Sequence, residues 1–363
     1  MGIAAAAQTV FADGKRPISE LLLEPSADIL RDAGDTPIDC VLVSTNDTAR
    51  YLAAVLSELC GVTPRISGTM ESMCSSGGAA LITAYSYVRS GLARTVLVAG
   101  AENPGSPGSV LDWDMSRGQF RSPIYWGSIL TKSYMRRYGV SREDLAAIPA
   151  KNLSQAQDNP SSLHGSPCTI SDVLASPPVT EDLNLLDCSR LCSGSAAVLV
   201  ADGPTCRRIT DTPVWIRGLS QYTASAGFGA GGPYHQIPSA GEAAKAAYAM
   251  AGTTASMVDV AEVHDAFSVC EPMALESLGM APPGRGAALS GELYRTGSRR
   301  VNPRGGILGA GHPLGATGLA QAAEVFAQLR GEAGRRQVEN ARTGVIQGMS
   351  AAGTGSVVVV MES

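Results

Sequence analysis

Three short stretches of the chain place cysteine and histidine side chains at turns, where they could do chemistry. In MCSSGGAAL, Cys74 stands directly before two serines, two glycines and a helix-like run. In EVHDAF, His264 follows a strand-like run, and in GGILGAGHPLGATG, His312 lies among glycines. A thiol and two imidazoles at strand ends suit thiol-based acyl transfer. One imidazole takes the thiol proton, and the other donates a hydrogen bond to a thioester oxygen.

Cys74 has two interpretations. At the start of a helix, the dipole and the unpaired N–H groups would favour the thiolate and lower the thiol pKa. Gly77 and Gly78, followed by two alanines, leave room for another backbone to approach. The alternative is a buried core thiol, because free cysteine is among the most buried residue types. The position of Cys74 alone leaves both interpretations open.

The two histidine turns differ in how strongly they indicate function. Asp265 could simply cap the following helix, and His264 could be a satisfied interior histidine. Around His312, the many glycines cost backbone entropy unless chain segments must pass closely or φ must be positive. The loop around His312 is therefore a stronger functional signal than EVHDAF alone.

Other candidate sites are weaker. Cys188 and Cys192 are the only closely spaced cysteines, but neither their spacing nor a second Cys/His pair fits zinc, so we expect no metal. His164 and His235 lie among prolines, glycines and serines and are interpreted as loop residues. The stretch GFGAGG (227–232) matches a dinucleotide-binding pattern, but PYHQIP follows where a helix should begin, so we interpret it as a loop.

Strand-like and helix-like runs alternate along the chain, which predicts an α/β fold. Each half contains a helix, a strand, a reactive-looking turn, a helix and a strand in that order, although the halves share no obvious identity. Clusters of Pro, Ser and Gly with partial helices indicate an inserted loop domain. We expect an N-terminal half (1–102 with 186–205), a loop domain (103–185) and a C-terminal half (206–363). The expected strands cover 39–45, 95–102, 196–202, 214–224, 259–267 and 355–363, with a short extended stretch at 64–67. The expected helices cover 46–61, 78–91, 128–139, 141–157, 242–252, 268–279 and 315–331.

Composition excludes several classes of protein. The 363 residues suffice for two domains, and 41 glycines with 5% aromatic residues predict a core of small side chains. A net charge of -5 without any Lys/Arg run gives no footprint for nucleic acid. Apolar tracts are far shorter than the roughly 20 residues of a membrane helix, and the N-terminus has no basic leader. The 8 scattered cysteines are expected to be reduced, in a cytoplasmic protein.

Four stretches together resemble the thiolase superfamily: MCSSGGAAL, LLDCSRLCSGSAAVLVAD, EVHDAF and GGILGAGHPLGATGLAQ. HDAF is similar to the HDxF motif of the sterol-carrier-protein-type and archaeal branch, where degradative thiolases carry NEAF. The resemblance begins near ILRDAG and runs to the end of the chain. It implies a duplicated five-layer αβαβα core with a loop domain over the site. It also implies an acyl-CoA or acyl-carrier thioester as substrate, no cofactor, and a homodimer or tetramer, in some members with a small OB-fold partner.

The resemblance also implies a role for each matching residue. Cys74 matches the acylated nucleophile, and His312 matches the base that activates it and lines an oxyanion hole. His264 matches the residue that completes this hole together with a bound water. A second hole is expected from the backbone N–H groups of Cys74 and Gly353.

Departures from the family pattern concern the second acid/base. Thiolases that condense acyl groups usually carry another cysteine, either in an HDCF motif or in a terminal CxG turn. Here Ala266 stands in the first place and GMSAAGTG in the second, where Ser350 is a poor substitute because an unactivated hydroxyl does not ionise near neutral pH. Cys270 lies one helical turn beyond Ala266, and we expect it not to serve. Leu153 stands where the family has the histidine of a KNH motif.

The predicted function is a thiolase-like acyltransferase that loads Cys74 and passes the acyl group to an acceptor, in specialised biosynthesis. One alternative is an ordinary acetyl-CoA C-acetyltransferase with an unrecognised acid. An alternative of another class is a non-catalytic scaffold or lipid-binding subunit. Retention of Cys74, His264 and His312 argues against this last alternative, since such a subunit would not need all three.

Overall fold

A computed structural model describes residues 1–104, 122–225 and 232–363 of the chain. The strands of these residues form one mixed sheet in the order β3-β2-β4-β5-β1-β6-β9-β8-β7. Only a short antiparallel contact of β1 with β6, at Gly2 and Ile3, joins its two halves. The strands are β1 (Gly2–Gln8), β2 (Cys40–Ser44), β3 (Ile66–Met70), β4 (Thr95–Glu102), β5 (Gly194–Ala201), β6 (Val214–Thr223), β7 (Val260–Glu262), β8 (Thr343–Ser350) and β9 (Gly355–Glu362).

The two halves of the sheet repeat one topology, which confirms the duplicated core. From the outer edge inward, the first half runs β3-β2-β4-β5-β1 and the second runs β7-β8-β9-β6. In both halves a parallel pair, β2 with β4 or β7 with β8, is followed by an antiparallel pair, β4 with β5 or β8 with β9. An isolated parallel bridge from Val301 to Ala261 of β7 occupies the place that β3 has in the first half.

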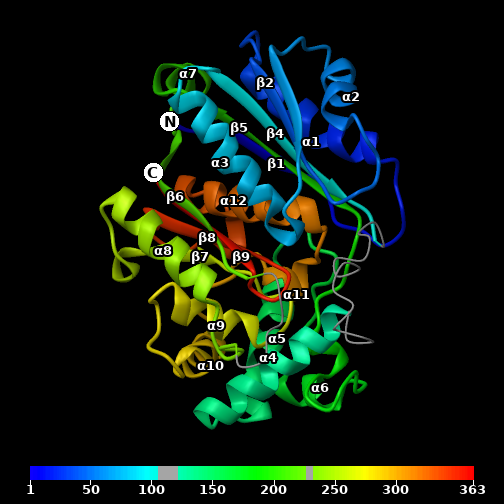
Figure 1. Cartoon of the computed structure of the whole chain (residues 1–363), viewed down its shortest axis with the longest axis vertical. Coiled ribbons are helices and arrows are strands. Elements are labelled where there is room, and N and C mark those ends of the chain that lie inside the picture. The colour runs from blue at the N-terminus through cyan, green and yellow to red at the C-terminus, as the bar shows by residue number, and fades with distance from the viewer. Residues whose placement is uncertain (105–121, 226–231) are drawn as a thin grey trace.

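Alternate side chains of each strand enter different cores, as period-2 geometry requires. Val96 and Val98 of β4 join Val357 and Val359 of β9 in a central core, together with the apolar faces of α3 (Ser76–Arg89) and α12 (Leu314–Arg330). Their strand neighbours face outward, into one cluster beneath α1 and α2 and another beneath the helices of the second half. Five layers result, with α3 and α12 in the middle (Figure 1). The outer helices are α1 (Ile18–Ala33) and α2 (Leu52–Leu59) on the first half, and α8 (Pro238–Ala251), α9 (Cys270–Ser277) and α10 (Gly286–Thr296) on the second.

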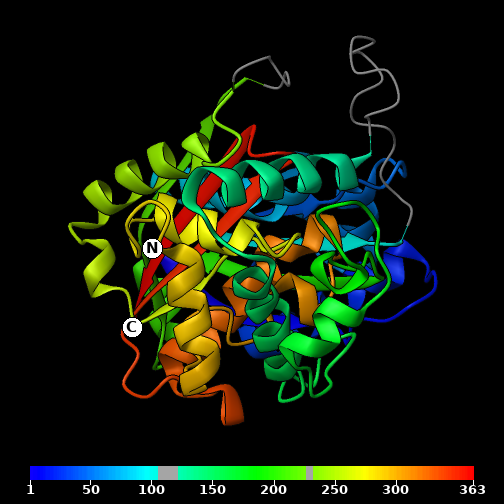
Figure 2. The same cartoon turned by 90° about the horizontal axis from the view of Figure 1, so that it is seen from below.

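The inserted segment packs on the second half of the core. It contributes α4 (Pro123–Tyr138), α5 (Arg142–Ala156) and α6 (Ile170–Ala175), and α5 lies against α10 and the short α11 (Gly306–Ala310). Ser122 and Ser141 cap the first two of these helices through their side chains. Seen from below, these helices cover the end of the molecule away from α1 and α2 (Figure 2). We propose the division into 1–102 with 186–205, 103–185 and 206–363. The NPGSPGS cluster, beyond its first two residues, and GFGAGG, apart from Gly232, lie outside the described residues.

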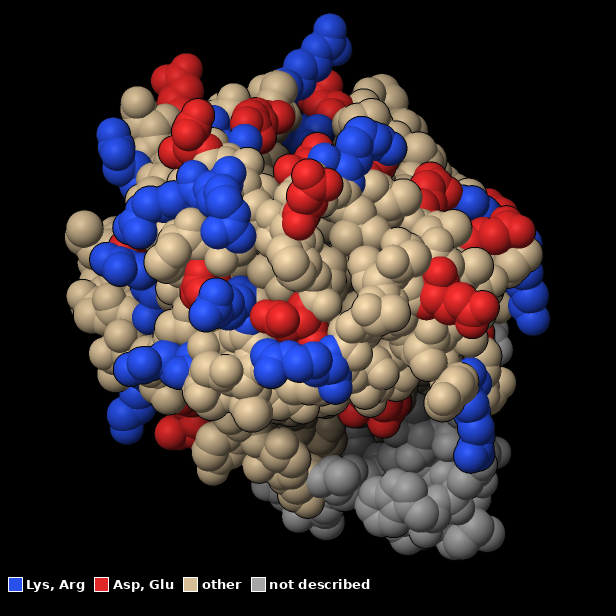
Figure 3. Space-filling model, turned by 90° about the horizontal axis from the view of Figure 1, so that it is seen from above, with Lys and Arg blue, Asp and Glu red and all other residues tan. Residues whose placement is uncertain are grey.

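Seven described helices and strands do not follow from the sequence patterns: β1, α1, α6, α7 (Gly203–Ile209), α10, α11 and β8. On the face seen from above, Lys and Arg side chains are interspersed with Asp and Glu (Figure 3). Among the helices of the described ranges, none combines the length and apolar character that crossing a membrane requires.

Candidate active site

The turn that carries Cys74 is held in a strained conformation. Cys74 lies in a short 3-10 turn, Met73–Ser75, that runs directly into α3. Met73 has a φ of 51°, a left-handed conformation that costs energy for a residue with a side chain. Its N–H donates to Glu71, and its carbonyl accepts from the side-chain amide of Asn46 at 3.3 Å. Such strain persists only where surrounding contacts impose it, which is typical of functional turns.

Glycines allow the starts of α3 and α12 to cross, as expected from Gly77 and Gly78. A Cβ on Gly77 would lie 2.9 Å from the backbone nitrogen of Leu319, and a Cβ on Gly318 would lie 2.7 Å from that of Gly78. Both contacts are closer than real Cβ atoms approach other backbone. The crossing brings the residues just before the two helices, Cys74 and His312, into one place.

The structure brings Cys74, His264 and His312 together. The sulfur and one ring nitrogen from each histidine all lie within 4.8 Å of one another. The two imidazole rings are 5.3 Å apart between centroids and meet edge to face at 73°. All three residues line a single cavity of about 1230 Å³. These atoms are also close enough to hold a metal ion, and thiolate with imidazole is a donor set that zinc accepts.

His312 presents one ring nitrogen to the cavity. Its Nδ1 lies 2.9 Å from the hydroxyl oxygen of Thr317, whereas its Nε2 has no hydrogen-bond partner among the described residues. If Nδ1 carries the proton and donates it to Thr317, Nε2 is left as the acceptor that a general base needs. Burial lowers the pKa of His312 well below its ordinary value, so the ring is neutral at pH 7.

His264 is held by its backbone rather than by its ring. Its N–H donates to the side-chain oxygen of Gln347 at 3.0 Å, while its Nδ1 has no partner within the described ranges. Burial lowers the pKa of His264 to about 4, so this imidazole is also neutral. A neutral imidazole can donate one hydrogen bond to an oxygen in the cavity, as an oxyanion hole requires.

A single extended segment connects the two histidine turns. Ser189 donates its N–H to the carbonyl of Ala266, and Cys188 forms a β-bridge with Phe267. Further along the same segment, the carbonyl of Arg190 accepts the N–H of His312 at 2.9 Å. Residues 188–191 therefore fix the position of the HDAF turn relative to the GHP turn.

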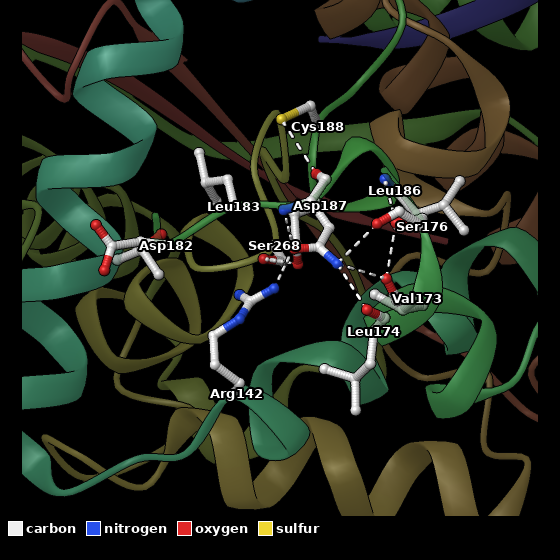
Figure 4. A network of polar contacts seen from close by, with 12 residues as sticks. Arg142, Val173, Leu174, Ser176, Asp182, Leu183, Leu186, Asp187, Cys188 and Ser268 are labelled. Atoms are coloured by element: carbon white, nitrogen blue, oxygen red, sulfur yellow. Dashed lines mark hydrogen bonds and ion pairs between the residues drawn. The ribbon is translucent and has the colours of Figure 1, made fainter. Parts of the chain in front are cut away.

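The buried carboxylate of Asp187 anchors this segment. It accepts from the guanidinium of Arg142 on α5 and, at 2.7 Å, from the hydroxyl of Ser268 just after the HDAF motif. Figure 4 shows Arg142, Asp187 and Ser268 converging. Because Asp187 is fully buried, these partners must compensate the loss of its hydration. The motif LLDCSRLCSG thus positions the two histidine turns, and both of its cysteines are free thiols.

Asp265 caps a different helix from the one expected. Its carboxylate accepts the backbone N–H groups of Ile307 and Leu308 at the start of α11, not those of α9, which follows it in the chain. It also accepts from the amide of Asn152, whose neighbour Lys151 forms a buried ion pair with Glu271 at 3.1 Å. The KN pair of the loop domain thereby holds the turn of His264 against the helix that leads to His312.

The backbone N–H at the helix start lowers the pKa of the Cys74 thiol as expected, but the net shift is upward because burial outweighs it. Burial raises the pKa of Cys74 to about 12, and its own backbone N–H only partly opposes this. Nearby Glu102, Cys270 and Glu71 raise it further. Desolvation outweighs the helix terminus because water can no longer stabilise the thiolate. The resting site is therefore a neutral thiol beside neutral imidazoles, and the thiolate forms only as an imidazole takes the proton.

This protonation state predicts an acylation rate that is flat between about pH 6 and about pH 9. The neutral imidazoles remain unprotonated down to their lowered pKa, which for His264 is about 4, and the thiol remains protonated up to about 12. The measurement is the single-turnover rate of acyl-enzyme formation against pH. A sigmoidal rise centred near the ordinary thiol pKa of about 8.5 would contradict it.

Two residues of the terminal turn that were considered for catalytic roles, Gly353 and Ser350, already form hydrogen bonds within the protein. Gly353 has the positive φ of 85° expected of such a turn, but its N–H donates to the carbonyl of Ser350 at 3.0 Å. Ala351 and Ala352, rather than Gly353, line the cavity. The hydroxyl of Ser350 lies 2.6 Å from that of Ser75 and donates to the carbonyl of Ser72, so it connects β8 to the turn that carries Cys74. The role of Gly353 in an oxyanion hole stays a prediction.

The structure places the remaining cysteine and histidine candidates in different surroundings. Cys270 lines the same cavity as Cys74, and burial raises its pKa to about 12, so it is not a ready acid. Leu153, in the place of the family histidine, also lines the cavity. His164 lies 2.9 Å from the guanidinium of Arg190 at the cavity rim, and His235 packs edge to face on Tyr138 in a loop.

One buried carboxylate near the site, that of Glu102, was not among the functional residues predicted from the sequence. Glu102, at the end of β4, accepts from the N–H and side chain of Asn46 and from the N–H of Gly315 in the GHPLG turn. Because Asn46 also contacts the turn that carries Cys74, Glu102 connects this turn with the turn of His312. A signal was available in the sequence, because a glutamate that ends an otherwise apolar strand is rarely buried without partners.

Two family models match the chain: "Beta-ketoacyl synthase, N-terminal domain" over residues 26–123 and "Thiolase C-terminal domain-like" over residues 234–363. The chain is 33% identical to an acetyl-CoA acetyltransferase of Methanothermobacter thermautotrophicus, over 94% of this chain and 93% of that protein. It is also 33% identical to sterol carrier protein 2 of Rattus norvegicus, over 79% of this chain but only 57% of that protein.

A further relative is the benzoylsuccinyl-CoA thiolase subunit BbsB of Thauera aromatica, 31% identical over 77% of this chain and 74% of that protein. A solved structure, the Ltp2-ChsH2(DUF35) aldolase, shares the fold with a TM-score of 0.88 at 22% identity, over 100% of this chain and 97% of the other. The fold and the relatives define a thiolase-like acyltransferase. The chain belongs to the thiolase superfamily, which confirms the resemblance seen in its motifs.

Proposed function

We propose that the chain accepts an acyl group from an acyl thioester onto Cys74 and passes it to an acceptor that is already nucleophilic. The convergence of the Cys74 sulfur with ring nitrogens of His312 and His264 within 4.8 Å carries this proposal. His312 takes the thiol proton as the sulfur attacks the thioester carbonyl. When the tetrahedral intermediate collapses, the CoA or carrier thiolate leaves and takes this proton from His312, which becomes neutral again. His264 donates a hydrogen bond to the developing oxyanion. No cofactor is needed, because the thioester itself supplies the activated acyl group.

The absence of a second thiol at the family positions limits the acceptor. Condensing two acetyl-CoA molecules requires a base positioned beside the acyl-enzyme to remove a weakly acidic α-proton. Ala266 offers no such group, and the Ser350 hydroxyl is engaged with Ser72 and Ser75. An electron-rich ring, a stabilised enolate or an amine would need only the removal of an acidic proton, which the histidines can accept.

The second candidate function is an acetyl-CoA C-acetyltransferase. It is favoured by the names of two relatives, the protein of Methanothermobacter thermautotrophicus and a Methanocaldococcus jannaschii protein that is 30% identical over 85% of this chain. In that function Cys270, which lines the cavity with Cys74 as Cys168 and Cys188 also do, would be a candidate acid/base.

The two functions differ in acetoacetyl-CoA thiolysis. We expect the wild type to form the acyl-enzyme within the first turnover but to cleave acetoacetyl-CoA slowly. Ala266→Cys is expected to raise thiolysis at least tenfold by supplying a thiol at the family position. Acylation and thiolysis are measured in parallel, and Ala246→Cys on the exposed side of α8 is the matched control. Rapid thiolysis by the wild type would favour the acetyltransferase instead.

We also propose an oligomer in a reducing compartment such as the cytoplasm. All eight cysteines are free thiols, which suits that compartment. Strand β3 ends the sheet and pairs only with β2, and an open sheet edge is a surface that a second copy can cover, giving a homodimer or a tetramer. The names of the BbsB subunit and of the Ltp2-ChsH2(DUF35) structure support a further partner subunit. The small OB-fold protein that the resemblance implies is our proposal for this partner.

A further inference from the structure

We propose that the cavity beside Cys74 selects a bulky hydrocarbon acyl group, aliphatic or aromatic, over acetyl. This inference rests on the proposed function, because it assumes that Cys74 carries the acyl group. It concerns a property that the two neutral histidines cannot set, namely the size and polarity of the group that the thioester delivers.

The cavity is much larger than an acetyl group needs. Its volume is about 1230 Å³, whereas pockets for drug-sized ligands span roughly 300–1,000 Å³. An acetyl group fills only about the volume of two or three waters, at about 30 Å³ each. An acetyl group together with the thioester end of its donor would leave most of the cavity volume unfilled. A ligand that leaves apolar space unfilled forfeits the contacts of the lining atoms.

The wall around the nucleophile is apolar and buried. Leu130 of α4, Leu308 of α11 and Met349 of β8 are each at most 5% exposed, and they belong to one hydrophobic cluster with Cys270 and Phe267. All five line the cavity, and none is charged. A polar acyl chain would lose its hydration here without gaining a partner, whereas a hydrocarbon loses nothing.

The charged lining residues outside the catalytic group lie toward the solvent. The Arg190 side chain is 56% exposed and pairs with Asp13 and His164. This polar rim suits the hydrophilic part of a thioester donor. The donor would therefore enter past Arg190 and direct its acyl group toward the wall of Leu130, Leu308 and Met349.

Another part of the cavity wall is held in place by hydrogen bonds. Leu185, Leu186 and Cys188 line the cavity on either side of the buried Asp187. The side-chain amide of Asn184 donates to the carbonyls of Val173, Leu174 and Ser176. Figure 4 shows these three residues near Asp187 and Leu186. A wall fixed in this way keeps the cavity preformed, so that a ligand need not meet the cost of opening it.

The selectivity is measured as the second-order rate of Cys74 acylation, followed by intact-protein mass spectrometry. Each methylene group moved from water into apolar surroundings is worth about fourfold. Octanoyl-CoA, with six more methylenes than acetyl-CoA, is expected to load at least about 100-fold faster, and phenylacetyl-CoA also faster than acetyl-CoA. Acetyl loading as fast as octanoyl loading would overturn the inference and leave the proposed function standing. Failure of every thioester to load Cys74 would overturn both.

Narrowing the cavity provides the matched test. Leu130→Phe is expected to slow octanoyl loading at least about tenfold while leaving acetyl loading within about threefold. Leu59→Phe, at an exposed position on α2, is the control and should change neither rate. The half-buried Leu186, which also lines the cavity, gives a second narrowing variant, Leu186→Phe. Retained acetyl loading shows that each variant is folded, and equal slowing of both acyl groups would contradict the inference.

Discussion

Replacing Cys74 with alanine is expected to abolish acyl-enzyme formation and to lower acyl transfer by at least about 10⁴-fold. The nucleophile cannot be supplied from elsewhere in the cavity. The other cysteines that line the cavity, Cys168, Cys188 and Cys270, lie outside the group of described atoms that converges with the two histidines. The measurement is release of free CoA from an acyl-CoA, together with the mass of the intact protein.

The control for this prediction is Cys60→Ala, which removes a half-buried thiol outside the cavity. It should leave CoA release unchanged. Full acyl labelling of Cys74→Ala would mean that another cysteine is the nucleophile. The geometry of the two histidines around Cys74 would then need a different explanation.

His312→Ala should slow acylation by roughly 10²- to 10⁴-fold, the usual contribution of a general base. With the thiol pKa near 12, Cys74 is almost entirely protonated at neutral pH, so attack depends on removal of its proton. The Nε2 of His312 is the ring nitrogen left open after its Nδ1 meets Thr317. Single-turnover acylation is the appropriate measurement because it isolates the step in which the proton moves.

Two comparisons sharpen the test of His312. His235→Ala removes an imidazole that packs on Tyr138 away from the cavity, and it should not affect acylation. Imidazole added to the buffer should partly restore the rate of His312→Ala, because the truncation leaves a space of matching shape. An acylation rate that is the same in His312→Ala as in the wild type would remove the residue from the role of base.

The central layers of the fold were predictable, whereas β1 and β8 were not. Strands such as β4 and β9 are continuous apolar runs, which is typical of strands buried on both faces. By contrast, GIAAAAQ is rich in alanine and has no strand propensity of its own. It forms β1 because β5 and β6 pair with its two edges. TGVIQGMS is interrupted by glycines and by Gln347, whose side chain turns out to hold the backbone of His264.

The site was predictable to the extent that its motifs are local. Cys74, His264 and His312 each lie in a short stretch with an unusual composition, and the structure brings all three together. The residues that position them were not visible, because contacts such as Glu102 to Gly315 join segments that are 213 residues apart. The sign of the thiol pKa shift depends on burial, which the helix start at Cys74 does not reveal.

The most direct test of the proposed acyl-enzyme is to locate the acyl group on the wild-type chain. The protein is mixed with octanoyl-CoA or acetyl-CoA and quenched in acid to preserve the thioester, and its peptides are then mapped by mass spectrometry. We expect one acyl group per chain, on the peptide that contains Cys74, which disappears when a thiol acceptor is added before the quench. An acyl group on any other cysteine, or a chain that stays unmodified with every thioester, would contradict the account.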